Sequence, residues 1–220
     1  MSIVEAGDDA GMNLSSDAAQ QGIEIPLGAT TIGLVCKDGV VLGSERRVAW
    51  GTFVLSKAGK KVFKIADRIG VACAGLMSDM QVIARTMEAQ AALYLLDMRR
   101  PMPVKAAAKL LSNILFERRA MPLFAQTIIG GVDDGGPRMF ILDLLGSLIE
   151  DKYAAVGSGA QVAIGVLEAE YKDGITVEQG KEIVVRAIKS AVERDAASGN
   201  GVDILTIMQS GASEISESIR

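Results

Sequence analysis

The order of the predicted secondary-structure elements is the feature of this sequence that most restricts its fold. Runs of β-branched and apolar residues, which are typical of strands, fall in three groups, at residues 30–75, 125–153 and 202–208. Apolar residues at helical spacing predict two helices in each interval between these groups. Paired helices do not fit the alternation of a doubly wound sheet. Two sheets packed face to face, each covered by a helix pair, would bury every apolar face, so the order allows a four-layer α+β sandwich.

Local signals predict where individual elements begin and end. Two capping boxes, Ser78 with Gln81 and Thr176 with Gln179, mark the first and last helices. The two remaining helices are expected near Pro103 and after residues 157–159. The expected strands are 30–36 and 40–43, joined as a hairpin, then 53–55, 62–65, 69–75, 125–132, 139–142, 148–153 and 202–208. The continuous apolar run at 69–75 indicates burial on both faces, and a short polar tail is expected after residue 208.

The residue composition excludes several kinds of chemistry. The sequence contains no histidine, which removes Ser-His-Asp and Cys-His catalysis and Cys/His zinc sites. Any base must therefore be a lysine, a carboxylate or a terminal amine. Gly157-Ser158-Gly159 precedes a helix but lacks the third glycine of a dinucleotide-binding loop, so no cofactor is expected. Cys36 and Cys73 lie in apolar strand-like runs and are expected to be buried, reduced thiols.

The charged residues are unevenly distributed along the chain. Residues 1–28 contain five acidic residues and no basic one, which predicts an acidic flexible leader before a domain at 29–220. The first basic residue is Lys37, so the N-terminus does not resemble a secretory signal. Basic residues elsewhere occur as isolated pairs, and no nucleic-acid partner is expected. Because no apolar run approaches the roughly 18 residues of a membrane span, we expect no membrane association and a cytoplasmic location.

Eight short motifs, in order and spacing, resemble an archaeal-type proteasome β subunit. They are TTIG at 30–33, KDGVVL at 37–42, SERR at 44–47, GKK at 59–61, AG at 74–75, GGVD at 130–133, GSG at 157–159 and RDAASG at 194–199. The resemblance covers roughly residues 29–208 and implies the αββα sandwich of N-terminal-nucleophile hydrolases. It also implies a threonine-type endopeptidase that degrades unfolded proteins. The implied partners are proteasome α subunits and other β subunits in stacked seven-membered rings, polypeptide substrate and, indirectly, an ATP-driven regulatory cap.

The same resemblance assigns roles to individual positions. The leader would be removed autocatalytically between Gly28 and residue 29, exposing a threonine whose hydroxyl attacks the peptide carbonyl. The new α-amine, with an ordinary pKa of about 8, would transfer the proton, so no imidazole is required. The matching positions are Glu45 and Lys61 for the acidic partner and catalytic lysine, Ser158, Asp195 and Ser198 for the supporting hydrogen bonds, Gly75 for the oxyanion-hole N–H, and Val48, Cys73 and Met77 for a specificity pocket that favours hydrophobic side chains.

The chain departs from the family pattern at the nucleophile, because the position of the threonine is occupied by Ala29. A methyl group cannot attack a carbonyl, so neither removal of the leader nor acyl-enzyme formation is expected through this residue, and the leader should stay attached unless an active neighbour trims it. Cleavage after Ala29 would expose Thr30, whose hydroxyl would lie on the opposite face of the strand.

Three interpretations of the whole chain follow. Ala29 is either a substitution introduced to trap a precursor or substrate, or the mark of a naturally non-catalytic structural subunit of a mixed ring. Retention of the other site residues favours an introduced or recent loss, although a structural subunit could keep them for packing. The third interpretation, an unrelated α/β domain that binds a small ligand, requires the register of the motifs to be accidental.

Overall fold

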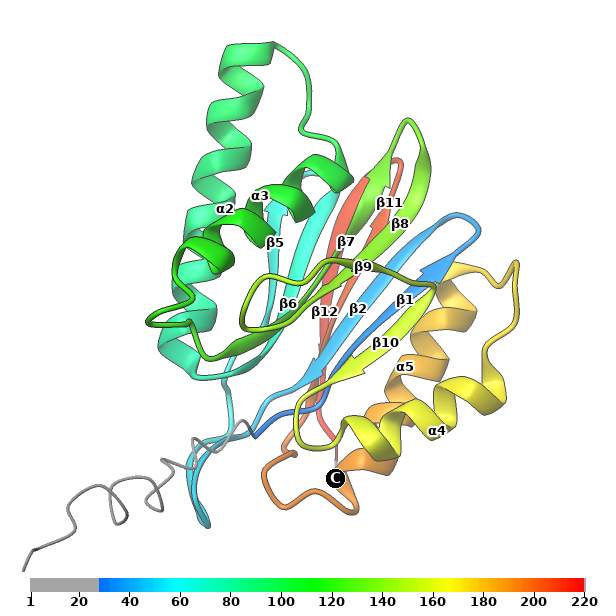
Figure 1. Ribbon diagram of the computed structural model, residues 1–220. Helices are drawn as coiled ribbons and strands as arrows, with labels where there is room; N and C mark the ends of the chain where they lie inside the picture. The colour runs from blue at the N-terminus through cyan, green and yellow to red at the C-terminus, as the bar shows by residue number, and fades with distance from the viewer. Residues whose placement is uncertain (1–27, 220) are drawn as a thin grey trace, which may run out of the picture.

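Two antiparallel sheets lie between two pairs of helices in the computed structural model, which describes residues 28–219 (Figure 1). The first sheet has the strand order β10-β1-β2-β11-β12. Its strands are β1 (Thr31–Cys36), β2 (Gly39–Glu45), β10 (Tyr153–Val156), β11 (Val202–Met208) and β12 (Gly211–Glu217). The N-terminal pair β1 and β2 therefore lies between β10 and β11, which come from the last third of the chain.

The second sheet has the strand order β5-β6-β7-β8-β9. Its strands are β5 (Val62–Ala66), β6 (Ile69–Gly75), β7 (Ala125–Asp133), β8 (Gly136–Leu142) and β9 (Ile149–Glu150). A separate hairpin is formed by β3 (Val48–Trp50) and β4 (Phe53–Ser56), between β2 and β5 in the chain. This hairpin projects from the lower end of the molecule in Figure 1.

Each sheet is covered on its outer face by one pair of helices (Figure 1). Helices α4 (Ala160–Glu170) and α5 (Val177–Val192) cover the first sheet, with Ile188 of α5 in one buried cluster with Ile32 of β1. Helices α2 (Met77–Met98) and α3 (Val104–Glu117) cover the second sheet, where Leu111 of α3 shares a cluster with Ile129 of β7. A third buried cluster, which includes Leu42 of β2 and Ile128 of β7, lies between the sheets. The predicted four-layer αββα sandwich is confirmed.

Two glycines let helix α5 lie close to the first sheet. A Cβ added at Gly43 of β2 would lie 2.5 Å from a methyl carbon of Val184, and one added at Gly180 of α5 would lie 2.6 Å from the sulfur of Cys36. Real side chains essentially never approach this closely, so both positions require glycine at this spacing.

Several predictions about the elements are confirmed. β1 and β2 form the expected hairpin, in which Cys36 lies opposite Gly39. Residues Ile69–Gly75 form a strand that is buried along almost its whole length. The capping box of α5 is present, because the Thr176 hydroxyl accepts the N–H of Gln179 while the side chain of Gln179 accepts the N–H of Thr176. Cys36 and Cys73 are buried and unbonded to each other, as expected for free thiols.

The predicted capping box of α2 is wrong. The helix begins at Met77, its N-cap is Leu76, and no side chain caps it. Ser78 lies inside the first turn, where its hydroxyl contacts Asp79 at 3.3 Å. The chain passes from β6 into α2 almost without a loop, so the helix starts before the serine and leaves it no capping position.

Two strand predictions are also wrong. Residues 148–153 form no single strand, because β9 belongs to the second sheet and β10 to the first, and the chain crosses between the sheets at Asp151 and Lys152. The expected polar tail contains β12, which pairs with β11 along its whole length. As an exposed edge strand, β12 is held by backbone hydrogen bonds more than by burial, so its sequence carries little apolar signal.

The predicted leader at residues 1–28 lies outside the described residues except for Gly28, so that division of the chain stays a prediction. Among the described residues, no helix combines the length and the apolar character needed to cross a membrane.

Candidate active site

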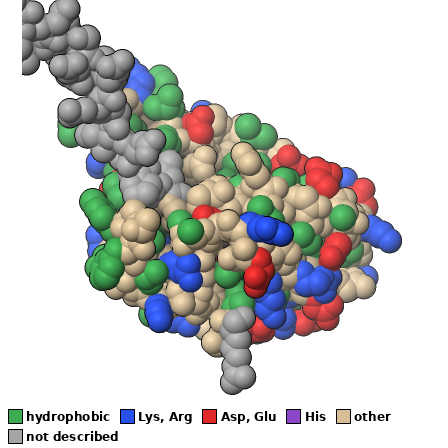
Figure 2. Space-filling model, turned by 90° about the horizontal axis from the view of Figure 1, so that it is seen from below, with side chains coloured by type: hydrophobic (Ala, Val, Ile, Leu, Met, Phe, Trp, Pro, Cys, Tyr) green, Lys and Arg blue, Asp and Glu red, His purple; other side chains and the backbone are tan. Residues whose placement is uncertain are grey.

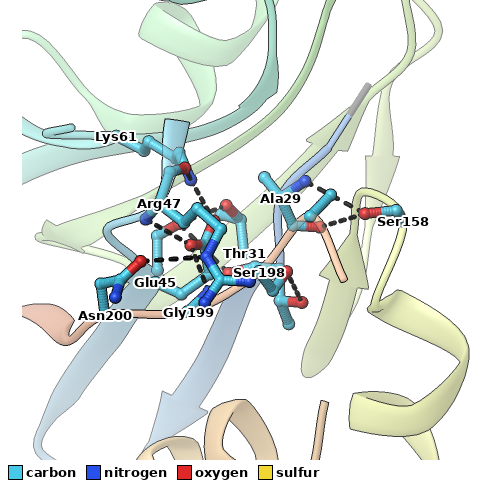
Figure 3. Close-up of polar contacts among 12 residues, drawn as sticks. Ala29, Thr31, Glu45, Arg47, Lys61, Ser158, Ser198, Gly199 and Asn200 are labelled. Atoms are coloured by element: carbon cyan, nitrogen blue, oxygen red, sulfur yellow. Dashed lines mark hydrogen bonds and ion pairs between the residues drawn. The ribbon is translucent and has the colours of Figure 1, made fainter. Parts of the chain in front are cut away.

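The polar residues named by the resemblance gather at one end of the first sheet, near Ala29, two residues before β1 (Figure 3). Thr31 at the start of β1 pairs with Ser44 near the end of β2, and Glu45 at the end of β2 pairs with Val202 at the start of β11. Because β11 begins here, the segment between α5 and β11, residues 193–201, also lies at this end of the sheet. Segments far apart in the sequence are thereby brought together.

Lys61 and Glu45 form a buried ion pair. The Nζ of Lys61 contacts Oε1 of Glu45 and donates to the backbone carbonyl of Arg47 at 2.6 Å. The other carboxylate oxygen, Oε2, accepts the backbone N–H of Arg47 at 2.6 Å and that of Gly199 at 2.9 Å. Lys61 is 2% exposed and Glu45 is fully buried. Every oxygen of the carboxylate is therefore bonded, and the ammonium is held in one orientation.

Burial shifts the pKa of both members of this pair. Loss of water around the ammonium lowers the pKa of Lys61 below its ordinary value, although the nearby Glu45 carboxylate opposes the shift. Burial likewise raises the pKa of Glu45, opposed by Lys61 and by the two backbone N–H groups. A lysine that holds its proton less tightly than usual is suited to proton exchange with a neighbouring group.

Asp195 orients two serine hydroxyls. Its Oδ2 accepts hydrogen bonds from the Oγ atoms of Ser158 and Ser198, each at 2.6 Å. A hydroxyl has a single proton, so both serine oxygens are left to act as acceptors on their other side. Ser158 accepts the backbone N–H of Ala29 at 3.2 Å, and the hydroxyl of Thr30 lies 2.8 Å from that of Ser198. The carboxylate thus directs one serine to residue 29 and the other to residue 30.

Ala29 lies beside these groups with only a methyl side chain (Figure 3). Its backbone is fixed on both sides, because its N–H donates to Ser158 and its carbonyl accepts the N–H of Gly159 at 3.3 Å. The neighbouring hydroxyls of Thr30 and Thr31 are fully buried and already hydrogen-bonded. Residue 29 therefore has no nucleophilic atom, and neither of the next two residues offers a free hydroxyl.

Two glycines of the predicted site, Gly28 and Gly75, have close neighbours that leave no room for a side chain. A Cβ at Gly28 would lie 2.6 Å from the Cβ of Ala197, which places the predicted processing bond beside the segment that carries Asp195. Gly75 ends β6 with φ +147°, and a Cβ there would lie 2.0 Å from the carbonyl oxygen of Phe124. Both the backbone conformation and the space require glycine at residue 75. Its role as an oxyanion donor stays a prediction.

The three residues predicted to line a specificity pocket have different environments. Val48 and Met77 meet at Gly59, where an added Cβ would lie 2.3 Å from the one side chain and 2.9 Å from the other. Cys73 is fully buried in the cluster beneath α2 and α3, with its sulfur 3.7 Å from the hydroxyl of Thr127. The structure brings the first two together, and the thiol of Cys73 faces the helix layer.

Sequence reasoning missed three residues that complete the cluster: Arg47, Gly199 and Asn200. Within SERR and RDAASG, the resemblance gave roles only to Glu45, Asp195 and Ser198. The available signal for Arg47 and Gly199 was that both belong to the shared motifs, which contact each other in the structure. Asn200 lies one residue beyond RDAASG, and no motif included it.

No group of three or more metal-ligating side chains occurs within residues 28–219. The groups present are a lysine with a lowered pKa, two buried or partly buried carboxylates and several oriented hydroxyls around residue 29. Such an arrangement can hold and transfer protons at residue 29. Together with the αββα sandwich, it defines the class of N-terminal-nucleophile hydrolases.

Comparison with known proteins defines the family within that class. A family model described as "Proteasome subunit" matches residues 25–207. The "Proteasome subunit beta 2" of Pyrobaculum calidifontis is 48% identical over 193 residues, which cover 88% of this chain and 95% of that protein. The protein of the same name from Caldivirga maquilingensis is 50% identical over 182 residues, covering 83% and 91%. The "Proteasome subunit beta 1" of Ignicoccus hospitalis is 46% identical over 188 residues, covering 86% and 94%. The chain belongs to the proteasome subunit family.

Proposed function

We propose that this chain is a β-type subunit of the proteasome core particle, with the site of a threonine endopeptidase but without its nucleophile. The observation that carries the proposal is that Lys61, Glu45, Ser158, Asp195 and Ser198 are assembled around residue 29 while residue 29 itself is alanine. A buried lysine whose pKa is lowered by burial, next to oriented hydroxyls, is typical of a site that transfers protons.

With threonine at residue 29, the chemistry would take two steps. The hydroxyl attacks the carbonyl carbon of the peptide, its proton passes by way of the α-amine to the leaving amine, and an acyl-enzyme forms as the peptide C–N bond breaks. Water then attacks the ester, which releases the acid and restores the hydroxyl. Lys61 would stabilise the developing alkoxide by its charge, and Ser158 would hold the backbone of residue 29 in place.

The partners of the chain belong to the same proposal. We expect assembly with α-type and other β-type subunits into stacked seven-membered rings that receive unfolded polypeptide from an ATP-driven cap. Two groups of exposed large apolar side chains are suited to subunit contacts. They are Leu93, Leu95, Leu96 and Met98 on α2, and Trp50, Phe53 and Leu55 on the β3–β4 hairpin. Figure 2 views the molecule from below and shows hydrophobic side chains along its left side, which is the side of the hairpin in Figure 1.

The proposal is tested by peptide hydrolysis with assembled particles that carry Ala29→Thr. We expect the rate to rise at least about a thousandfold over the Ala29 particle, because the reaction depends on the missing hydroxyl. Ala29→Val is the matched control, since valine has the shape of threonine without its oxygen. If correctly processed Ala29→Thr particles cleave no faster than the valine control, the alternative of a purely structural ring subunit is correct.

A further inference from the structure

The two halves of the polar cluster come from different parts of the fold. Glu45 is the last residue of β2, and Lys61 immediately precedes β5. Asp195 and Ser198 lie in the segment 193–201 between α5 and β11. Gly199 is one residue that joins the halves, because its N–H donates to Oε2 of Glu45 at 2.9 Å and its carbonyl accepts the N–H of Arg46 at 3.1 Å. The relative position of the halves therefore depends on how firmly this segment is held against the end of β2.

Arg47 is bonded to the lysine half through its backbone. Its N–H donates to Oε2 of Glu45 at 2.6 Å, and its carbonyl accepts from Nζ of Lys61 at 2.6 Å. Both bonds involve main-chain atoms, so any residue at position 47 could make them. They fix the backbone of residue 47 beside the ion pair and determine where its side chain begins.

The side chain of Arg47 reaches the other half (Figure 3). Its Nε donates to Oδ1 of Asn200 at 2.9 Å, and its Nη1 donates to the carbonyl of Ala196 at 2.7 Å. Its Nη2 lies over Gly199, where an added Cβ would be only 2.4 Å from it. The guanidinium thus holds the segment on both sides of Ser198, at Ala196 and at Asn200.

The chemistry of these contacts is specific to arginine. The guanidinium presents several N–H groups in a rigid fork, which can bond two acceptors four residues apart at the same time. A lysine at this position would supply one compact ammonium and could satisfy one acceptor well. Asn200 has φ +68°, a conformation that asparagine and glycine adopt more readily than other residues, and there its side chain accepts from Nε.

We propose that Arg47 is a positioning residue for the peptidase reaction: its guanidinium holds the segment with Asp195 and Ser198 in register with the Lys61–Glu45 pair. Arg47 acts through these groups, and its hydrogen bonds go to Glu45, Lys61, Ala196 and Asn200. The inference rests on the proposed function for its effect on catalysis, but the structural coupling between Arg47 and residues 196–200 exists whether or not the chain is active.

The kinetic test uses assembled particles that carry Ala29→Thr. Arg47→Gln and Asn200→Gly should each lower kcat about tenfold or more with KM changed less than about twofold, because a small misplacement of catalytic groups is costly. In the double variant, kcat should fall by less than the product of the two single factors, since both substitutions remove the same contact between Arg47 and Asn200. Arg47→Lys should not restore kcat. Arg46→Gln, which removes the neighbouring charge but none of these contacts, is the control and should keep kcat near that of the parent.

A second measurement is independent of activity. In particles of the unsubstituted Ala29 chain, Arg47→Gln should increase hydrogen exchange at the amides of residues 196–200 about tenfold or more relative to Arg46→Gln. Inactivity of Ala29→Thr itself would refute the proposed function and leave the exchange result to decide the coupling. Unchanged exchange, or unchanged kcat per assembled particle in Arg47→Gln and Asn200→Gly, overturns the proposal.

Discussion

At the scale of single residues, the buried ion pair of Lys61 and Glu45 should have a large effect on the free energy of unfolding. Both side chains are buried, and each depends on the other for compensation of its charge. Removing one partner of a buried pair leaves the remaining charge without water and without a counter-ion. The backbone N–H groups of Arg47 and Gly199 reduce this cost for the carboxylate but do not replace the ammonium.

Lys61→Met should lower the free energy of unfolding by about 3–5 kcal/mol, measured by urea titration of the Ala29 chain. Lys61→Met combined with Glu45→Gln removes both charges and should recover most of the loss. In the Ala29→Thr background neither variant should cleave peptide, because the lysine is absent from both. Equal stability of the parent and Lys61→Met would show that the pair is not buried in solution as it is in the structure.

The buried thiols predict a pH dependence of stability. Burial raises the pKa of Cys36 to about 12, with a smaller contribution from the Asp38 carboxylate. Burial also raises the pKa of Cys73 to about 12, opposed by its contact with Thr127. In the unfolded chain these thiols ionise near their ordinary value of 9.0. The stabilisation they contribute is therefore complete below about pH 9 and is lost as the pH rises toward 12.

Between about pH 8 and about pH 10, the parent should lose about 3 kcal/mol more unfolding free energy than the Cys36→Ala/Cys73→Ala variant, since each thiol contributes about 1.4 kcal/mol per pH unit. Urea titrations of both chains at each pH measure the difference. Identical pH profiles would mean that the thiols are exposed to solvent in the folded chain.

At the scale of elements, the sequence predicted the strand and helix groups because their apolar periodicity is strong, and it failed where packing or pairing acts without such a signal. β12 forms because β11 offers it an edge, although its own residues are mostly polar. α2 starts at Met77 because β6 runs directly into it, so a capping pattern at Ser78 had no consequence. The site was predictable only as far as the resemblance extended: it gave Glu45 and Asp195, but the side-chain contacts of Arg47 depend on the tertiary fold.

The two capping patterns differ in a way that can be measured. Thr176→Ala should lower the free energy of unfolding by about 1 kcal/mol, because the hydroxyl satisfies the N–H of Gln179 at the start of α5. Ser78→Ala should change it by less than about 0.5 kcal/mol, because that hydroxyl caps nothing in the structure. Similar losses in urea titrations of the two variants would contradict the assigned start of α2.

At the scale of the whole molecule, the strand order is what builds the site. β2 lies between β1 and β11. The segment before β1 with Ala29, the end of β2 and the segment before β11 therefore meet at the same end of the first sheet. No local segment contains the site, and it exists only when both sheets and α5 have packed. If the leader is removed by a nucleophile at residue 29, as proposed, that removal should require the folded chain.

The intact mass of the chain in assembled particles tests this account most directly. With Ala29→Thr, the account predicts a chain that begins at residue 29, because the restored hydroxyl lies beside Ser158 and Asp195 and can cleave the bond after Gly28. With the unsubstituted Ala29 in particles that contain no other active β chain, it predicts the full-length mass. A full-length Ala29→Thr chain, or an Ala29 chain that begins at residue 29 in such particles, would contradict it.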